Sequence, residues 1–488
     1  MQETRLIQFL RSLDRSEVRD FRDFLNSPTF NKNKTVIKLF EILVKHYPEF
    51  SDSEVSPEFQ YSEVYGKEKF DYHKLKNLSS DLLALGKEFL AFKSYKTDKD
   101  AQELYTLKET RKRNLNLIFE NIIRNAEKRI ERQVIRDEKY MFYKMNLVDE
   151  HINFNAPRNP SINLELMQNK LDHFISYSVI MLLKFYNVML HDQIQFNHKY
   201  DLKMFDCVLE YVKKNNDETN PIMQIYYHII LLGMDKTDEN FFRLKELRGK
   251  YKNKLNSVDN YMAFLYLDSY CANAFNNECR IDLAYEQFLL TKECDMNLFP
   301  ELGKILYPDF IYSIKIALRV KEIDYAVHYI NEFKKNLTEE KDSTLNYCYA
   351  LIKHSKGETN KALELLAKTH FQSFIMKIQV KLFQLQLSYE MNYFDQTLSM
   401  IDSFRHYISR ETLLLDNLKS VLLKFLSITG NLIRYRSETA IDKKGNLLKI
   451  KYDIENLISN HFGIKLWLQE KLRDIENLKH LNKKEPLI

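Results

Sequence analysis

The sequence predicts an all-α protein built from antiparallel helix hairpins. Three observations support this: glycine and proline are scarce, apolar residues recur at helical intervals, and no segment has the alternation typical of a half-buried strand. Glycine and proline each account for 9 of the 488 residues, whereas an average protein contains about 7% glycine. Turn-dense β architectures are therefore disfavoured.

The first predicted domain covers residues 1–98 and is a small helical domain or an N-terminal cap on the helices after it. Asp14 and Glu17 have the spacing of a capping box, and apolar residues continue at helical intervals until Pro28. Three further helices are predicted, over 34–47, from an N-cap at Ser56 onward and over 71–95.

Residues 99–156 are predicted to form one long amphipathic helix and a linker. Apolar side chains recur there at steps of three or four, at Leu115, Ile118, Ile122, Ala126, Ile130 and Val134. Pro157 and Pro160 break helices, so we expect a domain boundary at this point.

Helical hairpins are predicted over 157–264, and C-terminal capping helices over 407–488. The most apolar stretch, Phe174–Leu190, is only just long enough to cross a bilayer and contains Lys184 and Asn187. It is predicted to be a buried core helix. The first twenty residues carry charges throughout and lack the apolar region of a signal peptide, so a cytoplasmic location is expected.

A degenerate repeat occupies residues 265–406. Four segments share a small residue followed four places later by a bulky apolar one: ECRIDLAYEQF (278–288), KEIDYAVHYI (321–330), GETNKALELL (357–366) and NYFDQTLSMI (392–401). The small residues are Ala284, Ala326, Ala362 and Thr397, and the bulky ones are Phe288, Ile330, Leu366 and Ile401. A small residue allows two helices to approach closely, and the bulky residue fills the groove one turn later.

This pattern resembles the tetratricopeptide repeat, most closely in LSYEMNYFDQTLSMI (387–401). The early Trp of that repeat is missing, and no Pro ends the units. The resemblance implies a tetratricopeptide-like α-solenoid preceded by the N-terminal helical cap domain. The N-terminal segments FLNSPTFNKNKTVIKLFEIL and KLKNLSSDLLALGKEFL also resemble the start of a group of uncharacterised bacterial helical proteins.

The resemblance further implies a concave groove, lined by the first helix of each hairpin, that binds a peptide or helix of a partner or the chain's own N-terminal helices. The family's groove positions correspond here to Tyr266, Ser269, Asn273, Ile311, Lys315, Arg319, Tyr347, His354, Gln379, Gln386 and Tyr389. This mixture of polar and aromatic groups with two cations suits backbone amides, carboxylates and ring stacking. We therefore expect a non-enzymatic scaffold or adaptor.

No catalytic, cofactor or metal site is predicted. The closest glycines, Gly430 and Gly445, are too far apart for a phosphate-binding loop. None of the 13 histidines belongs to an HExxH motif or follows a Glu by three residues, and the five cysteines form no CxxC pair. The cysteines are expected to be reduced and buried.

Two alternatives stay open. A nucleic-acid-binding regulator would use basic helices of the N-terminal half, where Lys32, Lys34 and Lys38 lie near a break between two helices, although the net charge is only +5. A helical enzyme is the weaker alternative, because it would require a closed, polar-lined cavity with a perturbed carboxylate or histidine.

Overall fold

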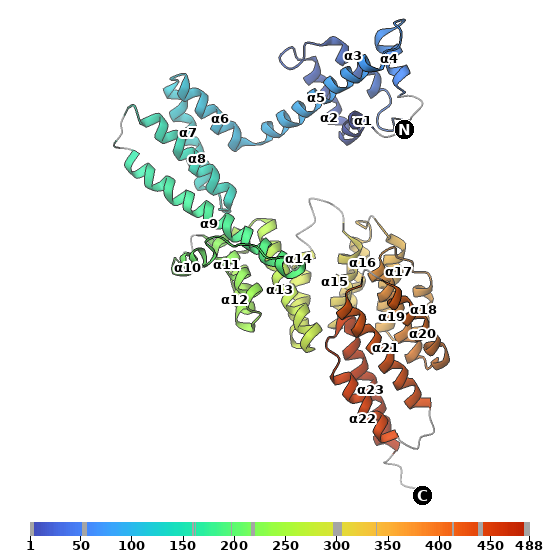
Figure 1. Cartoon of the computed structure of the whole chain (residues 1–488). Coiled ribbons are helices and arrows are strands. Elements are labelled where there is room, and N and C mark those ends of the chain that lie inside the picture. The colour runs from blue at the N-terminus through green and yellow to red at the C-terminus, as the bar shows by residue number, and fades with distance from the viewer. Residues whose placement is uncertain are drawn as a thin grey trace. The chain divides into compact units, whose positions relative to one another are not determined.

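The protein is all-α, as predicted (Figure 1). A computed structural model describes residues 4–50, 56–158, 161, 163–196, 198–215, 220–295, 305–337, 339–411, 414–437 and 443–482. Within these ranges there is no strand, apart from one isolated bridge between Ile305 and Leu337. The chain divides into two compact units, residues 1–133 with 140–174, and residues 134–139 with 175–488.

The first unit opens with helices whose caps agree with the sequence prediction. The Asp14 side chain accepts the backbone N–H of Glu17, and the Glu17 side chain accepts that of Asp14, each at 2.8 Å. Phe21 is fully buried against the rings of Phe9 and Phe40. The helices that belong entirely to this unit are α1 (Arg5–Ser12), α2 (Arg15–Asn26), α3 (Lys34–Val44), α4 (Pro57–Tyr65), α5 (Tyr72–Thr97), α6 (Lys99–Lys112) and α7 (Asn116–Glu131).

The predicted single helix over 99–156 is wrong, because the structure divides this segment into α6, α7 and α8 (Glu138–Asn155). Asn114 has φ 57°, a left-handed conformation that asparagine tolerates and that ends a helix. The α7 helix then packs against α6, and Arg129 of α7 donates to Asp100 at 2.5 Å and to Glu103 at 2.7 Å. The turn also shifts the buried stripe of α7, which includes Phe119 and excludes Ile118.

Helix α9 (Asn163–Phe196) contributes its first residues to the first unit and the remainder to the second. By length and composition alone it could cross a membrane, and 28% of its most apolar window is buried. In the second unit Ile180 and Leu183 are fully buried, whereas Phe185 and Val188 are more than half exposed. The expectation of a buried core helix therefore holds for one face only.

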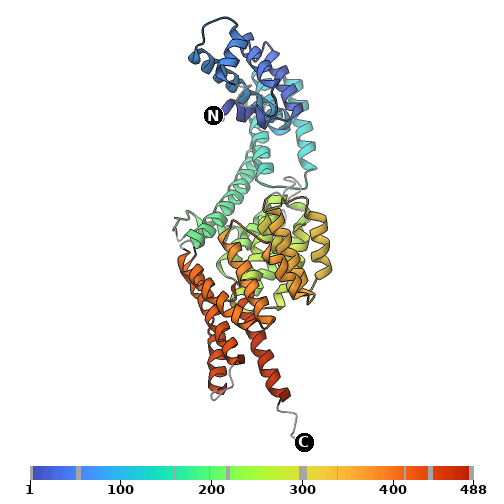
Figure 2. The same ribbon diagram turned by 90° about the vertical axis from the view of Figure 1, so that its right-hand side faces the viewer.

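The second unit consists of helices that pack against their neighbours in sequence (Figure 2). Contacting consecutive pairs include α11 with α12, α13 with α14, α15 with α16, α17 with α18, and α19 with α20. The bounds of α10 to α20 are α10 (Phe205–Lys214), α11 (Pro221–Met234), α12 (Asp238–Tyr251), α13 (Ser257–Glu278), α14 (Asp282–Asp295), α15 (Tyr307–Arg319), α16 (Ile323–Phe333), α17 (Lys341–Ser355), α18 (Thr359–Ala367), α19 (Phe374–Glu390) and α20 (Phe394–Arg410).

The small and bulky positions of the repeat are core positions in this unit. All eight side chains are buried, with no more than 3% exposed. Ala326, Ala362 and Thr397 are fully buried, so a larger side chain at any of them would meet a neighbouring helix.

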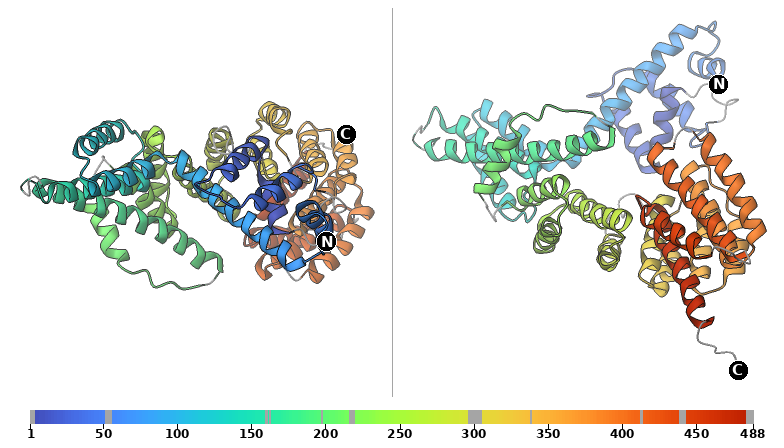
Figure 3. Two further views of the ribbon diagram at one scale, coloured as in Figure 1. Left: turned by 90° about the horizontal axis from the view of Figure 1, so that it is seen from above. Right: turned by 60° about the horizontal axis from the view of Figure 1, so that its bottom comes forward.

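The chain's last helices pack against α19 and α20 and against one another (Figure 3). They are α21 (Asp416–Ser437), α22 (Lys443–Glu455) and α23 (Ile464–Asn482), with a 3-10 turn at His461–Gly463. Ile464 and Leu468 of α23 are fully buried in a cluster with Phe425 of α21. The backbone N–H of Asn460 donates to Asn276 at 2.5 Å, which joins this end of the chain to α13.

Candidate functional site

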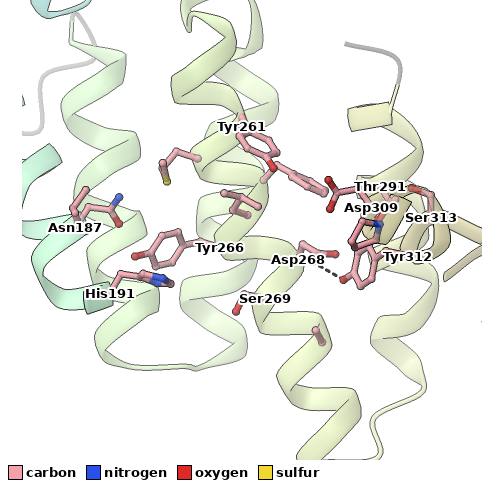
Figure 4. Close-up of a pocket in the computed structure, with 16 residues that line it drawn as sticks. Asn187, His191, Tyr261, Tyr266, Asp268, Ser269, Thr291, Asp309, Tyr312 and Ser313 are labelled. Atoms are coloured by element: carbon pink, nitrogen blue, oxygen red, sulfur yellow. Dashed lines mark hydrogen bonds between the residues drawn. The ribbon is translucent and has the colours of Figure 1, made fainter. Parts of the chain in front are cut away.

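The second unit contains a pocket of about 730 Å³ between α9, α13, α14 and α15 (Figure 4). Most of the surface that it presents is apolar or aromatic. Its lining residues are Asn187, Val188, His191, Tyr261, Met262, Phe264, Leu265, Tyr266, Asp268, Ser269, Ala272, Thr291, Pro308, Asp309, Tyr312 and Ser313.

Helix α13 supplies half of this lining. Asn256 caps it by accepting the backbone N–H of Asp259 at 2.8 Å. Tyr261, Leu265 and Asp268 are spaced at steps of four and three, so they lie on one face of the helix. One face of α13 therefore presents both apolar side chains and a carboxylate to the pocket.

A hydrogen-bonded network lies at the wall of the pocket around Asp268. The Tyr312 hydroxyl donates to Oδ2 of Asp268 at 2.6 Å, and Nε2 of Gln287 donates to Oδ1 at 3.0 Å. Arg319 in turn donates to Oε1 of Gln287 at 2.8 Å. Burial raises the pKa of Asp268, while its hydrogen bonds and the charge of Arg319 oppose that shift. The Asp268 carboxylate is therefore already satisfied by the protein.

Asp309 is a second carboxylate of the lining and has a different environment. It lies in the first turn of α15, directly after Pro308, and it makes no hydrogen bond or ion pair with another described residue. Burial against the pocket raises its pKa. The residue is exposed, so water solvates this carboxylate, and its place in the first turn of α15 is favourable for a negative charge.

The α9 side of the pocket carries a buried acceptor. Asn187 is 3% exposed, and its Oδ1 atom has no hydrogen-bond partner in the described structure. Figure 4 shows Tyr266 of α13 directed toward Asn187 and His191 of α9. Burial raises the pKa of Tyr266 to about 12, so this phenol stays protonated at neutral pH.

The structure brings only two of the predicted groove residues, Tyr266 and Ser269, into this pocket. Asn273 lies one turn after Ser269 and donates to its backbone carbonyl at 2.8 Å. Gln386 lies on α19, half-buried, outside the pocket. His354 contacts Oε2 of Glu390 through Nε2 at 2.8 Å.

Lys315 and Arg319 are half-buried residues of α15. The Lys315 ammonium donates to Oε1 of Gln379 and lies 5.3 Å from the centroid of the Tyr347 ring. The Arg319 guanidinium lies 3.7 Å from the centroid of the Phe275 ring. Within the described residues neither cation has a carboxylate within ion-pair distance, and burial lowers the pKa of both side chains.

Three predicted groove residues are not surface residues. Tyr347 is 2% exposed, Tyr389 1% and Ile311 2%. Tyr347 and Ile311 belong to the apolar cluster of α15 to α19, and Tyr389 packs against Trp467. The expectation that they line an open groove is wrong, because the neighbouring helices close over these side chains.

Several basic residues of the N-terminal half have partners within the protein. Arg111 pairs with Glu150 at 2.7 Å, Arg129 pairs with two carboxylates, and the Lys38 ammonium donates to the backbone carbonyl of Val64 at 2.6 Å. Among the described residues no group of three or more His, Cys, Asp or Glu could hold a metal ion.

Sequence reasoning missed Asn187, Asp268, Asp309 and Tyr312. Tyr312 lies three residues before Lys315 on α15, so the helical period of the predicted groove could have found it. For the other three residues the sequence contains no such signal, because what distinguishes them is their burial or the absence of a partner.

Comparisons of the chain with protein-family models, with curated proteins and with solved structures found no match.

Proposed function

We propose that this chain is a non-enzymatic interaction protein of the cytoplasm that binds a peptide or helix of a partner protein. In this proposal the helix hairpins of the second unit stack as a tetratricopeptide-like α-solenoid, and a side chain of the partner inserts into the pocket between α9, α13 and α15. The observation that carries the proposal is the apolar, aromatic lining of a 730 Å³ pocket with Leu265 exposed at 37%.

Two features favour binding over catalysis. The Asp268 carboxylate accepts two hydrogen bonds from neighbouring side chains, so it is poorly placed to act as a general base. The pocket surface is mainly apolar, which suits the insertion of a side chain from a partner.

The ion pairs of Arg111 and Arg129 favour a protein partner over a nucleic acid. A cation that is already paired with carboxylates gains less from contact with a phosphate than a free one. In the nucleic-acid alternative, Lys32 and Lys34 of the N-terminal half are the cations that would contact phosphates.

A displayed peptide library selected against the full chain tests the proposal. Ser269→Trp places a bulky ring at an exposed lining position, and Ser257→Trp places the same ring at an exposed position of α13 outside the pocket. We expect peptides that bind the wild type and Ser257→Trp equally and lose binding to Ser269→Trp.

The pocket assignment would be contradicted by peptides that bind Ser269→Trp as tightly as the wild type, or by a library that yields no binding peptide. A fluorescent DNA or RNA duplex, titrated across a salt series, tests the alternative. Tight binding with a steep salt dependence would transfer the function to the N-terminal half.

A further inference from the structure

One face of α9 carries a long apolar stripe. Its positions follow one another at alternating steps of three and four residues and are apolar except for one serine. Because α9 is one continuous helix, residues at these steps share a face. The α9 stripe consists of Leu164, Met167, Leu171, Phe174, Ser178, Met181, Phe185 and Val188.

Most of the α9 stripe is open to water. Leu164 is 79% exposed, and five further side chains are each about half exposed, namely Met167, Leu171, Phe174, Phe185 and Val188. Half of a large apolar side chain amounts to roughly 100 Å² of surface. These six side chains therefore expose roughly 600 Å², as much as the largest apolar patch of a typical monomer. Such a patch marks a surface that another structure covers.

The period of the stripe indicates that a helix covers it. Alternating steps of three and four are the a and d positions of a heptad, the period at which two helices pack along their whole length. The stripe runs from Leu164 to Val188, a length of about 36 Å. The next position of the heptad is Asp192, whose charge ends the stripe.

The sizes of the side chains suit a second α9 helix that runs in the opposite direction. In a twofold antiparallel pair, positions at equal distances from the two ends of the stripe meet. The layers are then Leu164 with Val188, Met167 with Phe185, Leu171 with Met181, and Phe174 with Ser178. Each phenylalanine ring thus has a smaller side chain opposite it, and the bulky Phe174 faces the smallest residue of the stripe.

A parallel pair fits less well, because equal residues would meet. Phe174 and Phe185 would each face an identical ring, whereas Ser178 would face another serine. Two layers would then be overfilled and one would be nearly empty, and both defects cost stability.

We infer that a second copy of this chain covers the α9 stripe, in an antiparallel pair of α9 helices. A stable interface buries about 800 Å² on each partner. The stripe supplies most of this area, and the half-buried Ile175 and Leu182 flank it and add to it. The inference goes beyond the proposed function, since Val188 is the one stripe residue that also lines the pocket.

Sedimentation velocity of the full chain measures self-association. Leu171→Glu places a carboxylate in the stripe, where the helix pair would bury it without a counter-charge, so the dimer should weaken by about a hundredfold. Asn169→Glu adds the same charge at an exposed position of α9 outside the stripe. We expect the wild type and Asn169→Glu to form dimers at concentrations at which Leu171→Glu is a monomer.

Phe174→Ser and Ser178→Phe test the direction of the pair. In the antiparallel pair these two positions face each other, so either substitution alone leaves two serines or two phenylalanines in contact and should weaken the dimer about tenfold. The double variant restores one ring opposite one serine and should recover most of the affinity. Circular dichroism verifies that all variants are folded.

The inference would be overturned by a wild type that stays monomeric as its concentration is raised into the micromolar range, or by Leu171→Glu that dimerises like the wild type. A double variant weaker than both single variants would refute the antiparallel direction. Monomeric wild type that binds neutral phospholipid vesicles, with binding lost in Leu171→Glu, would assign the stripe to a bilayer surface instead. Peptides that depend on Ser269 should be selected by Leu171→Glu as well, so the proposed function and this inference can fail separately.

Discussion

Trp467 of α23 donates its indole N–H to Oε1 of Glu390 on α19 at 2.9 Å. His354 of α17 contacts the other carboxylate oxygen, and Lys471 of α23 pairs with Oε1 at 3.0 Å. One carboxylate thus joins three helices. His354 was expected to face a partner, but it instead takes part in this intramolecular contact.

Replacement of Trp467 with Phe is expected to destabilise the protein by ~1–3 kcal/mol. The variant loses the hydrogen bond to Glu390 and part of the packing against Tyr389 and Phe425. Urea unfolding followed by circular dichroism measures the effect, since Trp467 is the single tryptophan. Arg473→Ala, at an exposed position of α23, is the control, and an equal loss in both variants would contradict the role given to Trp467.

The stabilisation from Glu390 is expected to depend on pH. Burial raises the pKa of this carboxyl, but hydrogen bonds from His354 and Trp467 together with the charges of His354 and Lys471 lower it overall, to about 2. Because the pKa of the folded state lies below the ordinary value of 4.5, the contribution is complete above about pH 4.5 and is lost as the pH falls toward 2.

The difference in free energy of unfolding between the wild type and Glu390→Gln measures this contribution. It should be constant above about pH 5 and shrink in more acidic solution. A difference that does not vary between pH 6 and pH 3 would mean that the carboxylate charge contributes nothing.

Lys315 is expected to make stability rise with pH in a second window, at alkaline pH. Burial lowers its pKa from 10.5 to about 8. Between these two values the unfolded chain binds the proton and the folded chain does not, so stability rises with pH in this window. The free energy of unfolding of the wild type should therefore increase relative to that of Lys315→Met between pH 8 and pH 10, and a constant difference would show that the ammonium is well solvated.

Because Lys315 and Arg319 make buried contacts, reversing both charges would test folding as much as binding.

Ala362→Leu is expected to cost ~1–3 kcal/mol, because Ala362 is fully buried where α18 packs against α17. Lys361→Leu places the same side chain at the adjacent exposed position and should unfold close to the wild type. Thermal unfolding gives the midpoint temperature of each variant. Equal midpoints would mean that a small side chain at this repeat position is not needed for the close packing of α17 and α18.

The features that could be predicted from the sequence are local ones. The capping box of Asp14 and Glu17 lies within one helical turn, and the all-α class is indicated by apolar periods and the scarcity of glycine and proline. The buried positions of the repeat, such as Ala326 and Ile330, could be recognised because they lie one turn apart on the same helix.

The prediction failed where a contact or a backbone turn decided the outcome. Asn114 adopts a left-handed conformation that ends α6, although the apolar period continues through it. The groove positions taken from the tetratricopeptide repeat placed Tyr347 and Tyr389 on a surface, but packing against neighbouring helices buries both rings. Helical period determines which residues share a face, and it does not determine what covers that face.

The sequence by itself therefore determined the helical class, the caps and the small and bulky core positions, since each depends on residues within a few turns of one another. Only the tertiary structure decided the candidate site. Asn187 and Asp309 come together in one pocket, and Trp467 reaches Glu390 across 77 residues, through the packing of helices far apart in sequence. The chemical character of these side chains depends on burial and on whether a partner is present, and both properties arise only when the helices have packed.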